Sequence, residues 1–151
     1  MTVQTSVTKL IIHHSESPSQ TTSFADIRRW HITERKWKEI GYHAVIHRDG
    51  QVVRGRDEGT QGAHAAKGGF NKNSLGICLC GHFDKEQPTK EQWLSLYTVL
   101  SEWCKRYGIK PGSNTIIGHR DAPGETKTCP GENVYRHLAL VRQYVQRLLD
   151  K

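Results

Sequence analysis

Short β-favouring apolar runs alternate along this chain with segments in which apolar residues recur at helical spacing. Each run has the length of a buried strand, and they are KLIIH at 9–13, SLGICLC at 74–80 and NTIIG at 114–118. The helical stripes cover residues 24–30, 93–107 and 134–148. Strands that alternate with helices build a sheet covered by helical layers. The pattern therefore predicts an α/β fold with a central mixed sheet flanked by helices, in which the run at 74–80 is a central strand.

Local signals mark where these elements begin and end. Ser23 with Asp26, and Thr89 with Gln92, have the spacing of capping boxes at helix starts. The dipeptide Asp49-Gly50 separates two β-favouring runs, which predicts a hairpin with a two-residue turn. The glycine-rich stretch 59–73 predicts a loop, and the stripe at 134–148 predicts one C-terminal helix.

Length and composition limit the organisation of the chain. Its 151 residues are typical of one domain, and no Pro/Gly/Ser-rich linker separates off a second, so we expect a single domain over residues 1–151. No apolar run is long enough for a membrane span, and the N-terminus lacks the apolar core of a signal peptide, which predicts synthesis into the cytoplasm. The net charge of +7 favours polyanions, either nucleic acid or a phosphate-rich envelope, although solubility alone also explains it.

Two histidines at strand ends and one cysteine form a candidate metal site. His13 ends the first apolar run, His119 follows the run TIIG, and Cys129 lies ten residues beyond His119 in a loop that can fold back. Two imidazoles and one thiolate suit tetrahedral zinc with an open fourth position. The alternative is that both histidines bond to backbone and that Cys129 is a small buried residue. Cys78 and Cys80 share a strand face, so we expect reduced thiols.

Two further polar side chains fit an amide-cleaving site. Lys127 shares a face with Cys129 in an extended segment, where an ammonium could stabilise an oxyanion. The phenol of Tyr42 could bond a water or a carbonyl. The alternatives are a surface lysine and a packed tyrosine. His14 points away from His13 in a strand, and Asp121 is a candidate for orienting a ligand.

Five sequence blocks, in order, resemble one family. They are IIHHS, GYHAVIHRDG, GRDEGTQGAH, NSLGICLCG and GHRDAPGETKTCPG, and the likeness spans residues 9–148. The chain resembles the zinc amidases of the peptidoglycan-recognition and amidase-2 type, and in particular their small single-domain phage lysozymes. The resemblance implies a zinc-containing substrate groove, with one Zn²⁺ held by His13, His119 and Cys129. It also implies Tyr42 and Lys127 as catalytic residues. His64 would be a substrate contact in the groove wall, or alternatively part of a mobile loop.

The same resemblance implies a biological role. It predicts an N-acetylmuramoyl-L-alanine amidase that acts as a phage endolysin, accumulates as a monomer in the host cytoplasm, and reaches the periplasm or cell wall after holin action. A cytoplasmic wall-recycling amidase is the rival with the same chemistry, and a module that binds muropeptide without cutting it is the non-enzymatic rival. Relatives of this kind can also restrain the phage RNA polymerase, which adds a possible protein partner.

Overall fold

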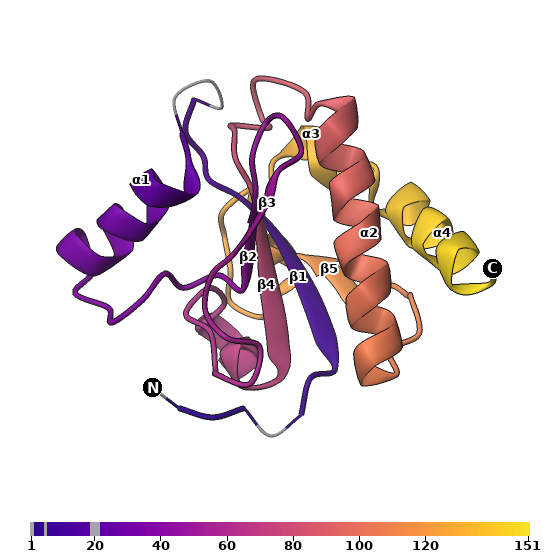
Figure 1. The fold of residues 1–151 in the computed structure, drawn as a ribbon, viewed down its shortest axis with the longest axis horizontal. Helices are drawn as coiled ribbons and strands as arrows, with labels where there is room; N and C mark the ends of the chain where they lie inside the picture. The colour runs from indigo at the N-terminus through magenta and orange to yellow at the C-terminus, as the bar shows by residue number, and fades with distance from the viewer. Residues whose placement is uncertain (1, 5, 19–21) are drawn as a thin grey trace.

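The computed structural model describes residues 2–4, 6–18 and 22–151. Its centre is a five-stranded sheet in the order β3-β2-β4-β1-β5 (Figure 1). The strands are β1 (Lys9–His14), β2 (Ala44–Ile46), β3 (Val52–Arg54), β4 (Ser74–Leu79) and β5 (Ile116–Gly118). The predicted mixed sheet is confirmed, and β4, from the run at 74–80, is its middle strand.

Strand direction decides where the carboxyl ends meet. β1 pairs in parallel with both β4 and β5, and β2 pairs in parallel with β4, while only β3 runs antiparallel, against β2. Four strands therefore end at one edge of the sheet. In open α/β sheets this edge is where functional groups gather.

Helices cover the two faces unequally (Figure 1). α2 (Lys90–Tyr107) and α4 (Leu138–Leu149) lie on one face, with the short α3 (Glu132–Tyr135) leading into α4. α1 (Phe24–Arg29) lies on the other face and continues into a π-helical turn, Trp30–Glu34. Both predicted capping boxes are present at the starts of α1 and α2. The main core lies between α2, α4 and the sheet, and Trp103 is its largest fully buried side chain.

Three predicted local structures differ from the observed ones. The hairpin loop has three residues, because the His47 amide donates to the Gln51 carbonyl at 2.9 Å and leaves 48–50 outside the ladder. Gly50 takes the left-handed position of this turn at φ +89°. The C-terminal helix is two segments rather than one, because the chain leaves helical geometry at His137, with φ −100° and ψ 5°. The predicted loop at 59–73 ends in short helical turns over Lys67–Asn73.

None of the described helices combines the length and apolar character needed to cross a membrane.

Glu58 ties the loop after β3 to the end of α2. Its carboxylate accepts hydrogen bonds from the side chains of Arg106 (2.5 Å), Tyr107 (2.6 Å) and Trp103 (3.1 Å). Burial alone would raise the pKa of Glu58, but these donors outweigh it and lower the pKa below the ordinary 4.5. The ionised carboxylate therefore stabilises the fold above that pH.

We expect Glu58→Gln to lower the free energy of unfolding by about 1–2 kcal/mol at pH 7, since it weakens charge-assisted hydrogen bonds. A carboxylate whose pKa is depressed by folding stabilises above its unfolded pKa, and the effect is lost as the pH falls through the folded pKa. The difference in the free energy of unfolding between the wild type and Glu58→Gln should therefore become smaller below pH 4.5. Urea unfolding of both proteins at pH 7 and at pH 3 measures this change. Glu102→Gln is the control, because its ion pair with Arg54 is about half exposed. Equal effects of the two variants would contradict this role for Glu58.

Candidate metal centre and its cleft

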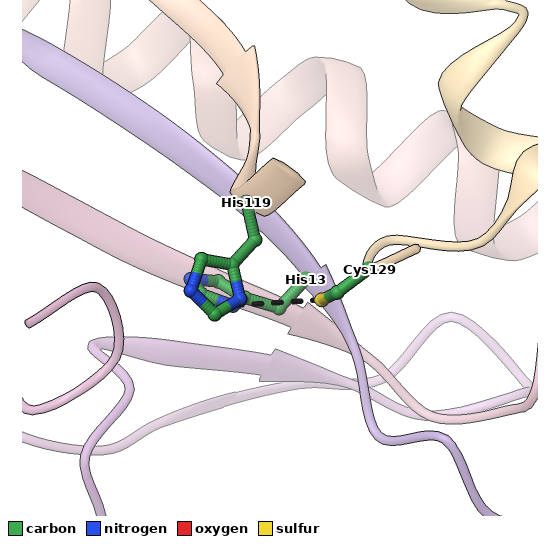
Figure 2. Close-up of side chains that lie close together, drawn as sticks. All are labelled: His13, His119 and Cys129. Atoms are coloured by element: carbon green, nitrogen blue, oxygen red, sulfur yellow. Dashed lines mark hydrogen bonds between the residues drawn. The ribbon is translucent and has the colours of Figure 1, made fainter. Parts of the chain in front are cut away.

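Three separate elements bring His13, His119 and Cys129 together at the carboxyl edge of the sheet (Figure 2). His13 lies in β1, His119 opens a short helical turn directly after the neighbouring β5, and Cys129 lies in the following loop. One ligand atom from each residue lies within 4.8 Å of the others. The structure thus brings together the three residues that the sequence predicted as metal ligands.

The loop after His119 folds back because its two ends are bonded to each other. The Arg120 amide donates to the Cys129 carbonyl at 2.8 Å, and the Arg120 side chain donates to the Thr128 carbonyl at 3.1 Å. Gly118 leaves room for the returning segment, since a Cβ there would lie 2.9 Å from Pro130. These contacts hold the Cys129 thiol against the strand ends.

The spacing and protonation of the three groups fit a divalent cation. His13 Nδ1 lies 3.7 Å from Cys129 Sγ, close to the roughly 3.6 Å that tetrahedral zinc bond lengths imply. Burial lowers the pKa of His13 and of His119, so both imidazoles are neutral and have a free lone pair. Burial raises the pKa of Cys129 to about 12, so its thiolate requires a nearby cation. The donor set is therefore one that zinc can use.

His119 is held from its far side by Glu125. Its Nε2 lies 3.1 Å from Glu125 Oε2, and the Glu125 side chain is only 6% exposed. The other carboxylate oxygen accepts from the amides of Thr126 (3.0 Å) and Lys127 (3.1 Å). Glu125 was not among the predicted site residues, because the sequence does not show which side chain of this loop reaches His119.

Asp121, which the sequence suggested for orienting a ligand, bonds elsewhere. Its carboxylate accepts from the Gly118 amide at 3.2 Å and from the Tyr135 hydroxyl at 2.5 Å. It therefore supports the turn after β5, and that prediction is corrected in favour of Glu125. His14 faces away from the cluster, as predicted, and its Nδ1 accepts from the Phe83 amide at 3.1 Å.

His64 lies directly behind His13. Its Nδ1 is 2.9 Å from His13 Nε2, and its Nε2 is 3.3 Å from the Ser74 hydroxyl. The side-chain oxygen of Asn71 fixes this loop by accepting from the His64 amide at 2.9 Å. His64 also lines the cleft but is only 8% exposed. The structure thus gives His64 a bond to a candidate ligand, and its predicted contact with substrate stays a prediction.

Tyr42 and Lys127 line the same cleft as the cluster. This cleft holds about 370 Å³ and is open to solvent. The Tyr42 ring centre lies 5.0 Å from that of His13. Burial raises the pKa of Tyr42 well above its ordinary value, so its phenol keeps its proton at neutral pH. Lys127 is exposed at the cleft wall, two residues before Cys129. Both residues therefore border the cleft that contains the cluster.

An α/β sheet with a His₂Cys cluster in an open cleft defines a class of protein with a candidate catalytic metal centre. Comparison with known proteins narrows this class. The family model described as N-acetylmuramoyl-L-alanine amidase matches residues 3–132. The endolysin of Escherichia phage T7 is 37% identical over 133 residues, which cover 84% of this chain and 82% of that protein.

Solved structures agree with this match. LysC, an N-acetylmuramoyl-L-alanine amidase from Clostridium intestinale, has a TM-score of 0.78 at 27% identity, over 99% of this chain and 93% of its own. Drosophila PGRP-LB has a TM-score of 0.79 at 29% identity, over 92% of this chain and 83% of its own. The chain belongs to the N-acetylmuramoyl-L-alanine amidase family and is an enzyme of that class.

Proposed function

We propose that this chain is a zinc-dependent amidase that hydrolyses the bond between N-acetylmuramic acid and the first L-alanine of the peptidoglycan stem peptide. The observation that carries the proposal is the His13, His119 and Cys129 cluster, in the cleft that Tyr42 and Lys127 also line. Membership of the amidase family supports the reaction class. One zinc ion held by these three residues would supply Lewis-acid chemistry, bringing the pKa of water toward neutrality and polarising a carbonyl.

The protein's own side chains have distinct roles in this proposal. The ammonium of Lys127 stabilises negative charge on the amide oxygen when the carbonyl is attacked. The phenol of Tyr42 stays protonated, so it donates a hydrogen bond to the substrate carbonyl or positions the attacking water. His64 contributes a wall of the cleft near the bound substrate. His13, His119 and Cys129 would hold the cation beside these side chains.

The biological role that we propose is that of a phage endolysin. Support comes from the endolysin of phage T7, with which the chain shares 37% identity over most of both proteins. Such an enzyme reaches the wall from the host cytoplasm through lesions made by a holin. The surplus of positive charge, +7 overall, favours approach to an anionic envelope. Activity on intact sacculi separates this role from that of a recycling amidase, whose substrate is soluble muropeptide.

The direct test is the metal content of the purified chain together with release of stem peptide from sacculi, before and after chelation. We expect about one zinc per chain, loss of peptide release on chelation, and recovery with added zinc. Free N-terminal L-alanine on the product identifies the bond that was cut. Zinc binding with no cleavage of sacculi or muropeptides would instead indicate a recognition module and would overturn the enzymatic proposal.

A further inference from the structure

The hydrogen bonds behind His13 determine which nitrogen of each ring has the proton. Ser74 Oγ lies 2.6 Å from the Phe70 carbonyl, which can only accept, so the Ser74 hydroxyl donates there. Ser74 Oγ must then accept from His64 Nε2, which lies 3.3 Å away. Neutral His64 consequently has its proton on Nε2 and a lone pair on Nδ1.

The same series of hydrogen bonds continues to His13 in the candidate metal centre. His64 Nδ1 is an acceptor, so His13 Nε2, at 2.9 Å, must donate to it. A neutral His13 with its proton on Nε2 has its lone pair on Nδ1. That nitrogen is the one that lies 3.7 Å from Cys129 Sγ. The series of hydrogen bonds from the Phe70 carbonyl to His13 thus leaves the lone pair of His13 on Nδ1, which faces the cluster.

His119 has the same tautomer, with its proton on Nε2, but through a different hydrogen-bond partner. The Glu125 carboxylate can only accept, so the nearby His119 Nε2, at 3.1 Å, must hold a proton. The lone pair of neutral His119 is therefore on Nδ1, on the side of the ring that faces the cluster (Figure 2). Two unrelated acceptors, one a histidine and one a carboxylate, impose the same tautomer on both rings.

The surroundings of His64 are shaped around its ring. A Cβ at Gly76 would lie 2.6 Å from His64 Cγ, and a Cβ at Gly62 would lie 2.6 Å from its Cδ2. Larger residues at either position would displace the ring from His13. Glu125 is similarly fixed, because its second oxygen accepts from two backbone amides of its own loop. Neither acceptor is free to turn away.

We infer that His64 and Glu125 are positioning residues that hold His13 and His119 with Nε2 protonated, so that both histidines bind the metal through Nδ1. This inference rests on the proposed zinc site and adds what fixes its geometry. Groups that orient metal-binding histidines typically change metal affinity by about 10- to 100-fold when they are removed. Glu125 also accepts from the Lys127 amide, so the same carboxylate fixes the turn that leads to the proposed oxyanion-stabilising residue.

The tautomers can be read directly from long-range ¹H–¹⁵N correlation spectra of the histidine rings in the full chain. Without metal, we expect His64 to show its proton on Nε2. With zinc added, His13 and His119 should both coordinate through Nδ1 and keep protonated Nε2. Coordination of either ring through Nε2 would overturn the inference for that ring and its acceptor.

Zinc affinity of substituted chains, measured by competition with a chelator, provides the second test. His64→Phe keeps the ring volume and removes the acceptor, and Glu125→Gln places an amide opposite His119. We expect each to weaken zinc binding about 10- to 100-fold. His64→Asn keeps an oxygen acceptor near the position of Nδ1, so it should bind zinc more tightly than His64→Phe.

Matched controls separate positioning from general loss of stability. His31→Phe removes another buried histidine, which accepts from the Gly41 amide at 2.9 Å, and should leave zinc affinity unchanged. Glu132→Gln removes the partner of Arg120 beside the same loop and should also have no effect. Wild-type affinity in both His64→Phe and Glu125→Gln would overturn the inference. A wild-type chain that binds no zinc would instead refute the proposed function. If His64→Phe fails to fold, the zinc affinity of Glu125→Gln and the wild-type spectra still test the inference.

Discussion

Cys129→Ala should abolish both zinc binding at stoichiometric concentration and hydrolysis of sacculi. The Cys129 thiolate would be the one anionic ligand of the three. The backbone at Cys129 is held in place, because its carbonyl accepts a hydrogen bond from the Arg120 amide. Structural zinc sites bind with apparent free energies of about 10–16 kcal/mol. Loss of one ligand from such a set should weaken affinity by about 10³-fold or more. Metal analysis after dialysis and release of stem peptide measure the two effects.

Cys104→Ala is the matched control for this substitution. Cys104 is also a buried free thiol, but it lies on the core-facing side of α2 and is not a member of the cluster. It should lose some stability, as small core truncations do, while zinc content and specific activity stay at the wild-type level. A Cys129→Ala chain that kept its zinc and its full activity would refute the proposed ligand set.

Removing the charge of Lys127 or the hydroxyl of Tyr42 should lower kcat while the metal stays bound. We expect Lys127→Met and Tyr42→Phe each to reduce kcat by about 10²–10³-fold, the range seen when one donor to a developing oxyanion is lost. The effect on KM should be small, because these groups act mainly as charge develops in the transition state. Steady-state kinetics on a soluble muropeptide, with zinc content measured on the same samples, provides the test.

Two control variants test whether the loss of kcat requires that the lysine and the tyrosine line the cleft. Lys110→Met removes an exposed lysine beyond the end of α2, and Tyr144→Phe removes the hydroxyl of an exposed tyrosine on α4. Neither residue lines the cleft, so both variants should keep the wild-type kcat. Comparable losses in the controls, or wild-type kcat in Lys127→Met, would rule out the proposed role of the cleft lysine.

Much of the fold and three site residues were accessible from sequence for a simple physical reason. Strand runs and helical stripes have different periods, so their alternation can be recognised in the order of residues alone. His13 lies near the end of β1 and His119 directly follows β5. These strands prove to be parallel neighbours, which places both side chains at one edge. Cys129 could be proposed because its loop is long enough to return, although its bonds to Arg120 could not be foreseen.

The supporting contacts were not accessible in the same way. The partners of His64 and Glu125 depend on how irregular loops fold, and irregular loops lack the repeating pattern of helices and strands. The three-residue hairpin turn was missed because Asp49-Gly50 suits two turn lengths, and pairing across the strands decides between them. The monomeric state, the holin and the phage RNA polymerase stay predictions, since surfaces that bind other proteins have no motif of comparable specificity.

The distance along the chain between the proposed ligands has a consequence for biosynthesis. His13 and Cys129 are separated by 116 positions, so the proposed centre is completed only after the segment up to Cys129 has left the ribosome. A nascent or truncated chain that lacks Cys129 should therefore have no amidase activity. A metal bound at this centre would also stabilise the folded state by mass action, by about 2.7 kcal/mol at a free concentration one hundred times its dissociation constant. Zinc supply would thereby set how long the enzyme survives proteolysis while it waits to reach the wall.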